Sequence, residues 1–253
     1  MNTVNVRNIV IGEGIPKICV PIVGKTKEEL LSEVAVLKGS AVDVVEWRMD
    51  WFEAVETVQA AVDMLQVLRE ALPDLPILAT FRSKKEGGER EVSTAYYVEL
   101  NKAIIDCKAA DLIDVELFTG EKEVKELIAY AHAAGVRVIM SNHDFDKTPS
   151  YHEILTRLQA MQKLDADIPK IAVMPTCKAD VLTLLQATND MHEKFADRPI
   201  ITMSMAGTGV LARLCGEVFG SALTFGAAKK ASAPGQMGVE DLKTVLTLLH
   251  KSL

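Results

Sequence analysis

The sequence predicts an α/β fold, the (β/α)8 or TIM barrel, from three observations. Short runs rich in Ile and Val alternate with longer amphipathic, charged stretches along the whole chain, a pattern typical of parallel strands joined by helices. Eight such pairs recur at a spacing of roughly 25–35 residues, the size of a βα repeat. The length of 253 residues also matches this barrel, which usually has about 250.

An open doubly wound sheet is the alternative fold. It often carries a glycine-rich phosphate turn of the form G-x-G-x-x-G after its first strand. Here the first predicted strand is followed by Gly24-Lys25-Thr26, which lacks that pattern. The residues therefore favour the barrel.

The predicted strands are short and β-branched, which favours strand over helix. In chain order they are Lys17–Val23, Val42–Met49, Ile77–Arg82, Leu112–Leu117, Val136–Asn142, Lys170–Met174, Pro199–Met205 and Ala222–Ala227. The leader Val4–Ile11 precedes the first repeat, and its alternation predicts a β-hairpin that closes the barrel floor.

Helical patterns fill the intervals between these strands. The first begins at Thr26, where the sequence resembles a capping box. Glu121–Ala134 and Val181–Phe195 have the same spacing, and Asp180 is the expected N-cap of the latter. No Pro/Ser-rich linker interrupts the pattern, so we expect residues 1–253 to form a single catalytic domain.

The composition excludes several classes of function. Hydrophobic residues make up 49% of the chain, charged residues 25%, and the net charge is −7, which argues against a nucleic-acid binder with a basic face. No apolar stretch approaches the roughly 20 residues of a membrane helix, and no signal peptide is apparent. The four cysteines form no C-x-x-C pair, so we expect a cytoplasmic protein with reduced thiols and no metal site.

Barrels of this class place their active sites at the C-terminal ends of the strands, so the candidate catalytic residues are those at these ends. Lys170 lies in an apolar strand and shares a face with Ala172 and Met174. If that face points inward, burial lowers the lysine pKa from about 10.4, and a neutral amine can form a Schiff base with a ketone. A strand-edge lysine that extends to solvent is the alternative.

His143 is the only one of the five histidines at the end of a predicted strand, the fifth, and an imidazole suits proton transfer at neutral pH. A histidine that only satisfies a turn is the alternative. Glu86 is a candidate for orienting that imidazole, although in this Lys-rich loop the residues alone favour a solvated carboxylate. The fourth strand carries Asp114 and Glu116.

Three arginines, Arg48, Arg82 and Arg213, belong to three different repeats. If they converge at one mouth, they form a pocket for a carboxylate or a phosphate. Structural pairs of Glu46 with Arg48 or Arg82 are the alternative.

Six segments at these positions resemble type I 3-dehydroquinate dehydratases, in the same order and spacing. They are Glu46-Trp47-Arg48, Phe81-Arg82-Ser83, Glu86-Gly87-Gly88, Ser141-Asn142-His143-Asp144-Phe145, Pro169-Lys170-Ile171-Ala172 and Ser232-Ala233-Pro234-Gly235-Gln236. The resemblance implies a (β/α)8 barrel, usually a homodimer, in the shikimate pathway of aromatic amino-acid biosynthesis. It implies dehydration of 3-dehydroquinate to 3-dehydroshikimate without a metal or an organic cofactor.

Carried over by position, the resemblance assigns the imine to Lys170, general base and acid catalysis to His143, and the holding of His143 to Glu86. It assigns the substrate carboxylate to Arg213. The hydroxyl contacts would be Glu46, Arg48, Arg82, Ser232 and Gln236, and the ring would be walled by Phe145, Met203, Met205 and Phe225. The two methionines taken alone are more typical of core packing.

One position departs from the family, because several members have Ser where this chain has Pro21. Proline offers no hydroxyl, which puts any substrate contact there in doubt. The loop Ser232–Gln236 has the character of a lid that excludes water.

Two other functions stay open at this point. A Schiff-base class I aldolase on the same barrel also needs a strand lysine, and the turn Gly207-Thr208-Gly209 lies where such barrels often bind phosphate. A non-catalytic barrel that binds a small acid would show affinity without turnover.

Overall fold

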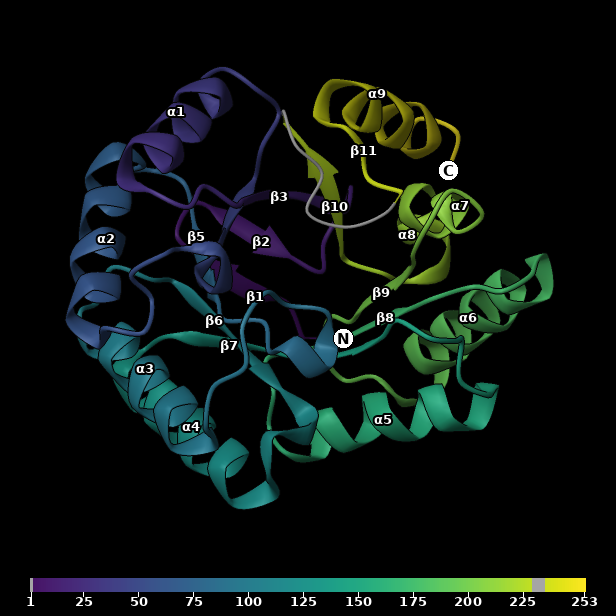
Figure 1. Cartoon of the computed structure of the whole chain (residues 1–253). Helices are drawn as coiled ribbons and strands as arrows, with labels where there is room; N and C mark the ends of the chain where they lie inside the picture. Colours follow the sequence, from purple (N-terminus) through teal and green to yellow (C-terminus); the bar gives the residue numbers. More distant parts are fainter. Residues whose placement is uncertain (1, 229–234) are drawn as a thin grey trace.

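Parallel strands form a closed ring in the computed structural model of the chain, which describes residues 2–228 and 235–253 (Figure 1). Neighbouring strands pair in chain order from β3 to β9, and β10 pairs with β3. A bridge between Ile200 and Ser221 closes the ring between β9 and β10. The strands of the ring are β3 (Lys17–Ile22), β4 (Val44–Arg48), β5 (Ile77–Thr80), β6 (Leu112–Glu116), β7 (Arg137–Asp144), β8 (Ile168–Val173), β9 (Ile201–Ser204) and β10 (Leu223–Ala227).

Helices surround the ring, and the longer ones bury apolar residues in the core between helices and strands (Figure 1). They are α1 (Lys27–Leu37), α2 (Val58–Ala71), α3 (Thr94–Asp106), α4 (Glu121–Ala134), α5 (Tyr151–Lys163), α6 (Lys178–Asp190), α7 (Val210–Leu214), α8 (Gly216–Phe219) and α9 (Val239–His250). The predicted (β/α)8 barrel is therefore confirmed. Within the described residues, no helix combines the length and the apolar character needed to cross a membrane.

The helix boundaries were predictable where a cap is strong. Helix α4 has the predicted bounds, and α1 begins after Thr26, whose side chain accepts a hydrogen bond from the Glu29 N–H at 3.3 Å. The prediction of Asp180 as an N-cap was wrong, because Cys177 is the N-cap of α6 and Asp180 lies in its first turn. The Asp180 carboxylate instead accepts the Thr176 N–H at 2.7 Å. The final predicted turn of this helix is a separate π-helical segment, η4 (Met191–Phe195).

Strand β7 is longer than predicted, which changes the setting of His143. Its pairing with β8 continues through His143 opposite Ala172 and Asp144 opposite Val173. The imidazole is therefore carried by a paired strand and not by the loop after it. A short strand that was not predicted, β11 (Met237–Gly238), pairs with β10.

The leader forms the predicted hairpin, with β1 (Val4–Val6) antiparallel to β2 (Ile9–Ile11). Val4, Val6 and Ile11 are buried and belong to the apolar cluster inside the barrel. The hairpin therefore closes the N-terminal end of the ring, as expected.

The interior of the barrel changes from apolar to charged along the strands. Side chains two residues apart on a strand point to the same face. The inward positions near the hairpin are Val44, Leu78, Leu112, Ile139, Ile168, Ile201 and Leu223. In five of these repeats, the side chains that follow on the same face are polar or charged. Two residues further along they are Glu46, Thr80, Asp114, Ser141 and Lys170, and four residues further along they are Arg48, Arg82, Glu116 and His143.

Candidate active site

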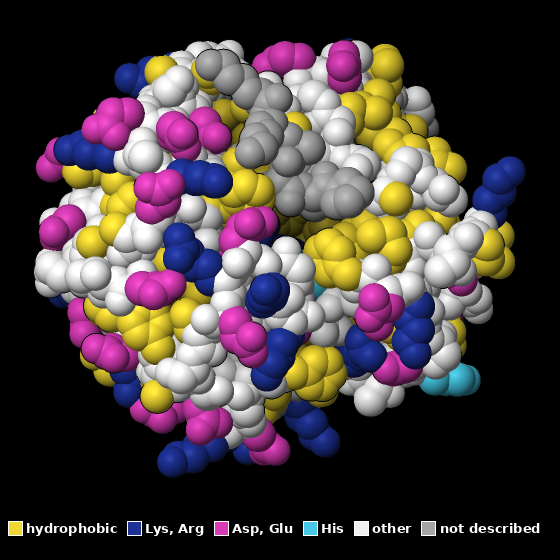
Figure 2. Space-filling view, viewed as in Figure 1, with side chains coloured by type: hydrophobic (Ala, Val, Ile, Leu, Met, Phe, Trp, Pro, Cys, Tyr) yellow, Lys and Arg dark blue, Asp and Glu magenta, His cyan; other side chains and the backbone are white. Residues whose placement is uncertain are grey.

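A pocket opens at the C-terminal ends of the strands, on the face shown in Figure 2. Figure 2 shows a hollow near the centre of this face, with hydrophobic side chains along one side. The pocket is lined by Glu46, Arg48, Arg82, Glu86, Gly87, His143, Phe145, Lys170, Ala172, Met203, Met205, Arg213, Phe225 and Gln236. The structure thus brings together every predicted site residue except Ser232, which lies outside the described residues.

Lys170 lies on β8 and points into the barrel, with only 3% of its surface exposed. Its Nζ lies 3.8 Å from Asp114 Oδ2 and 4.0 Å from Glu46 Oε1. On another side it lies 4.4 Å from the centre of the Phe225 ring. The predicted inward orientation is confirmed, and the alternative of a solvent-exposed lysine is wrong for this residue.

Glu86 contacts His143 directly, although the local sequence favoured a solvated carboxylate. Its Oε2 lies 3.0 Å from His143 Nδ1 and accepts the His143 backbone N–H at 2.9 Å. The short helix η2 (Lys84–Glu86) ends at Gly87, which has φ of +82°. A Cβ at Gly87 would lie 2.2 Å from the Phe145 ring, so glycine lets the loop turn Glu86 inward.

The environment tunes Glu86 and His143 in different directions. Burial raises the pKa of Glu86 to about 7 despite the nearby Arg82 guanidinium, and the Glu116 carboxylate adds to the rise. Burial also lowers the pKa of His143 well below its ordinary value, and the charges of Arg82 and Lys170 add to that effect. The imidazole is therefore neutral near pH 7 and able to accept a proton.

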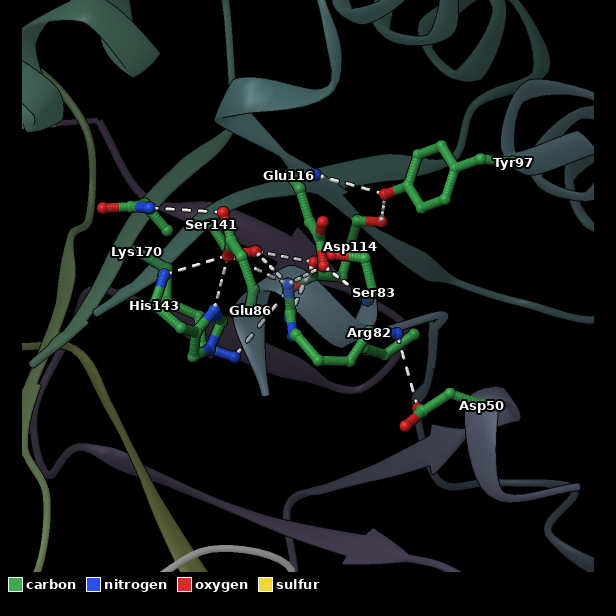
Figure 3. Close-up of polar contacts among 12 residues, drawn as sticks. Asp50, Arg82, Ser83, Glu86, Tyr97, Asp114, Glu116, Ser141, His143 and Lys170 are labelled. Atoms are coloured by element: carbon green, nitrogen blue, oxygen red, sulfur yellow. Dashed lines mark hydrogen bonds and ion pairs between the residues drawn. The ribbon is translucent and has the colours of Figure 1, made fainter. Parts of the chain in front are cut away.

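Arg82 is the centre of a buried network of charges (Figure 3). Its Nη1 donates to Glu116 Oε1 at 2.9 Å and to Ser141 Oγ at 2.8 Å. Its Nη2 lies 2.8 Å from Asp114 Oδ1. Burial opposes the charge of Arg82, but these carboxylates hold its pKa well above the ordinary value. The alternative pairing with Glu46 is not the one the structure shows.

Arg48 is held by Asp50, a residue that the sequence reasoning did not assign to the site. Arg48 Nε and Nη2 donate to the two Asp50 carboxylate oxygens, both at 2.7 Å. Glu46 accepts instead from Thr80 Oγ1 at 3.0 Å. The bidentate pair of Arg48 and Asp50 fixes the plane of the Arg48 guanidinium in the pocket wall.

A second row of residues supports Glu86 from outside the pocket. Arg157 Nη1 donates to Asn142 Oδ1 at 2.7 Å, and Asn142 Nδ2 donates to Glu86 Oε1 at 3.2 Å. Because a guanidinium can only donate, Arg157 fixes the orientation of the Asn142 amide. Sequence reasoning gave no role to Asp50, Asp114, Ser141, Asn142 and Arg157, although it placed Asp114 on the fourth strand.

The opposite side of the pocket combines apolar side chains with the guanidinium of Arg213. Met203, Met205 and Phe225 are buried there, and Phe145 is partly exposed at the rim. Arg213 on α7 lies with Nη1 3.7 Å from Met203 Sδ, and burial lowers its pKa to about 10. Pro21 is buried on β3, opposite Glu46 in the register.

A family model of type I 3-dehydroquinase matches residues 18–253. The chain belongs to the type I 3-dehydroquinase family. It is 57% identical over 252 residues to the 3-dehydroquinate dehydratase of Salmonella typhimurium, and the match covers 100% of both proteins.

Solved structures of this family superpose on the whole barrel. A type I 3-dehydroquinate dehydratase from Clostridium difficile, solved with covalently modified comenic acid, has a TM-score of 0.97 at 56% identity, covering 100% of this chain and 99% of that one. The Geobacillus kaustophilus enzyme has a TM-score of 0.96 at 37% identity, covering 99% and 97%. The barrel and its hairpin therefore match the fold of these solved structures.

Proposed function

We propose that the chain catalyses the dehydration of 3-dehydroquinate to 3-dehydroshikimate in the shikimate pathway, through an imine on Lys170. The observation that carries this proposal is a primary amine, 3% exposed, in the same pocket as a buried imidazole held by a carboxylate. Membership of the type I 3-dehydroquinase family supports the same reaction, which makes the chain a carbon–oxygen lyase.

Lys170 supplies the covalent step. Its ammonium gives up one proton, the amine attacks the substrate ketone and forms a C–N bond, and return of that proton with loss of one water yields a protonated imine. The imine withdraws electrons from the adjacent carbon, which makes a proton on that carbon much easier to remove. The apolar contact with Phe225 and the 3% exposure keep bulk water from competing for this nitrogen.

His143 supplies the proton transfers. The neutral imidazole takes the proton from the carbon next to the imine, and the resulting enamine expels the β-hydroxyl. The imidazolium then protonates the departing oxygen, so that water leaves and the imidazole returns to its starting state. Glu86 holds Nδ1 at 3.0 Å, which leaves Nε2 for the substrate. Hydrolysis of the product imine consumes one water and restores the Lys170 amine.

The remaining pocket residues bind and orient the substrate in this proposal. Arg213, a buried cation in an apolar setting, suits the carboxylate. Glu46, Arg48, Arg82, Ser232 and Gln236 would contact the hydroxyls, and Phe145, Met203, Met205 and Phe225 would enclose the ring. Pro21 has no hydroxyl to offer, so we propose no substrate contact for it.

We further infer that residues 1–253 act as one catalytic domain, as a homodimer in the cytoplasm, without a metal or an organic cofactor and without nucleic-acid or membrane partners. The net charge of −7 supports the part that concerns nucleic acid. Sedimentation of the purified chain tests the dimer, which a single monomeric species would contradict.

A turnover assay with 3-dehydroquinate tests the proposed reaction. The conjugated enone of the product absorbs in the ultraviolet, so dehydration appears as a steady rise in absorbance. The Lys170→Met variant is expected to lose this rise, while Lys178→Met, at an exposed lysine at the start of α6, keeps it. Cleavage of a carbon–carbon bond would instead indicate an aldolase, and binding without any product would indicate a non-catalytic barrel.

A further inference from the structure

Asp114 is a fully buried carboxylate that sequence reasoning assigned to no role, and its two oxygens have different surroundings. Oδ1 accepts from Ser141 Oγ at 2.7 Å and lies 2.8 Å from Arg82 Nη2. Oδ2 is buried and has no hydrogen-bond donor among the described residues. It faces Lys170, whose Nζ lies 3.8 Å away. Figure 3 shows these side chains gathered in one cluster.

The Lys170 nitrogen has two carboxylate neighbours, and they are not equivalent. Glu46 Oε1 lies 4.0 Å from Nζ, but the same oxygen already accepts from Thr80 Oγ1 at 3.0 Å. By contrast, Asp114 Oδ2 accepts no hydrogen bond from the described residues. A buried acceptor without a donor destabilises the folded state. Asp114 is therefore the better placed partner for an N–H group on Nζ.

Near pH 7, Asp114 is ionised, whereas His143 is neutral. Burial alone would raise the pKa of Asp114, but the Arg82 and Lys170 charges and the Ser141 hydrogen bond hold it below the ordinary value. The carboxylate is therefore a fixed negative charge and a poor proton acceptor near pH 7. The charged and titratable groups packed around Asp114 and Lys170 are Cys19 on β3, Glu46 on β4, Arg82 just after β5, Glu86 on η2, Tyr97 on α3, Glu116 on β6 and His143 on β7.

From this geometry we infer that Asp114 is a positioning residue, which aims the Lys170 amine at the substrate ketone and then serves as the counterion of the protonated imine. The role rests on the imine chemistry proposed above. An ammonium and a ketone give a protonated imine and one water, so the nitrogen carries one positive charge before and after the step. A single fixed carboxylate 3.8 Å away can neutralise both states without moving a proton.

The counterion has a consequence for catalysis. Only the protonated imine withdraws electrons strongly enough for His143 to remove the neighbouring proton. A negative charge within about 4–6 Å favours the charged form of a group by about 1–3 pH units. Asp114 therefore keeps the imine in its reactive form at pH values where it would otherwise lose its proton.

The Asp114→Asn variant tests this role, because it removes the charge and keeps the shape and the acceptor for Ser141 and Arg82. We expect kcat on the alkaline side to fall about 10- to 100-fold, because a smaller fraction of the imine is protonated, in line with a shift of about one to two pH units. The adduct on Lys170, trapped with borohydride and identified by intact mass, should still form. The alkaline limb of the kcat profile should move towards acid by at least about one unit. Affinity for the alcohol obtained by reducing the substrate ketone should stay close to that of the unchanged chain.

Asp167→Asn is the matched control, since it also removes a carboxylate charge, but outside the pocket, where Asp167 pairs with His132 and Arg137. It should leave both the alkaline kcat and the position of the alkaline limb unchanged. If Asp114→Asn matches Asp167→Asn in both measurements, Asp114 is only structural and the inference fails. Absence of adduct and product with the unchanged chain would instead overturn the proposed function itself.

A crystal structure of the unchanged chain trapped as the imine gives a second test that needs no variant. Asp114 Oδ2 is expected to lie within about 2.7–3.2 Å of the imine nitrogen. An imine nitrogen that turns away from Oδ2, beyond about 3.5 Å, would overturn the inference even if Asp114→Asn fails to fold.

Discussion

The two ends of the barrel interior are built on the same strands but differ in almost every physical respect. On β6, Leu112 belongs to the same apolar cluster as the hairpin, and two residues later Asp114 faces Lys170. On β8, Ile168 and Lys170 repeat the same change. A shift of two residues, about 7 Å along a strand, therefore separates an apolar floor from a charged mouth.

The apolar floor stabilises the fold, whereas the charged mouth carries the groups for the chemistry. Each buried aliphatic side chain of the floor contributes about 1.5–3 kcal/mol to folding. The mouth buries charges, which is costly unless partners compensate them, as the carboxylates around Arg82 do. Substitution of His143, which carries no charge near pH 7, should therefore change rates more than stability, and substitutions at the floor should do the reverse.

His143→Ala should give the largest effect on rate. Loss of a positioned general base is expected to lower kcat by about 10²–10⁴-fold, while the imine on Lys170 still forms and the melting temperature changes little. Kinetics with 3-dehydroquinate and thermal unfolding measure the two quantities. His132→Ala is the control, because His132 also pairs with a carboxylate, Asp167 at 2.8 Å, but outside the pocket. Equal rate losses in both variants would contradict the assignment.

Leu112→Ala tests the floor. The side chain is fully buried beneath the pocket, so its truncation is expected to lower the free energy of unfolding by about 2–5 kcal/mol. Well below the melting temperature, kcat should stay within about twofold of the unchanged chain, since no pocket residue is altered. Denaturant unfolding and steady-state kinetics check the two parts. A large loss of kcat in a stably folded variant would show that floor and mouth are not separable.

Glu86→Gln should change stability in a pH-dependent way. Burial raises the folded pKa of Glu86 from 4.5 to about 7, so the folded state binds more protons than the unfolded state between these values, and stability falls as pH rises through that window. The shift corresponds to about 3 kcal/mol for the ionised carboxylate above pH 7. Glu86→Gln should remove this cost, so its melting temperature should gain on that of the unchanged chain between pH 5 and pH 8.5.

Glu86→Gln should also change the pH dependence of kcat/KM. The ionised Glu86 holds His143, so kcat/KM of the unchanged chain should fall as pH drops through about 7. Glu86→Gln should be slower and should lack this acid limb. An acid limb of unchanged position in the variant would assign it to another group.

Arg157→Gln should give the smallest of these effects. Without the guanidinium, the Asn142 amide is free to rotate, and its bond to Glu86 at 3.2 Å is weakened. A single hydrogen bond is worth about 0.5–1.5 kcal/mol, so kcat should fall about threefold and the acid limb should move slightly to higher pH. Arg137→Gln, on the exposed end of β7, should leave both unchanged. A shift of equal size in both variants would exclude the Asn142 route.

The fold and part of the site were predictable because they depend on local periodicity. Alternation along β8 places Lys170 on the face of Ala172, and the closed ring turns that face inward. The contact of Glu86 with His143 was not predictable from a Lys-rich loop, because it depends on the turn at Gly87. The role of Asp114 comes from Arg82 and Lys170, which belong to other repeats, and the spacing of residues within one strand does not reveal such contacts.

Borohydride reduction in the presence of 3-dehydroquinate, followed by peptide mapping, tests the central claim most directly. The claim is that the amine at the mouth of the barrel forms a covalent bond with the substrate ketone. The account predicts one stable adduct per chain, on the peptide that contains Lys170, with loss of activity in proportion to labelling. Complete turnover with an unmodified Lys170 under the same reduction would contradict it.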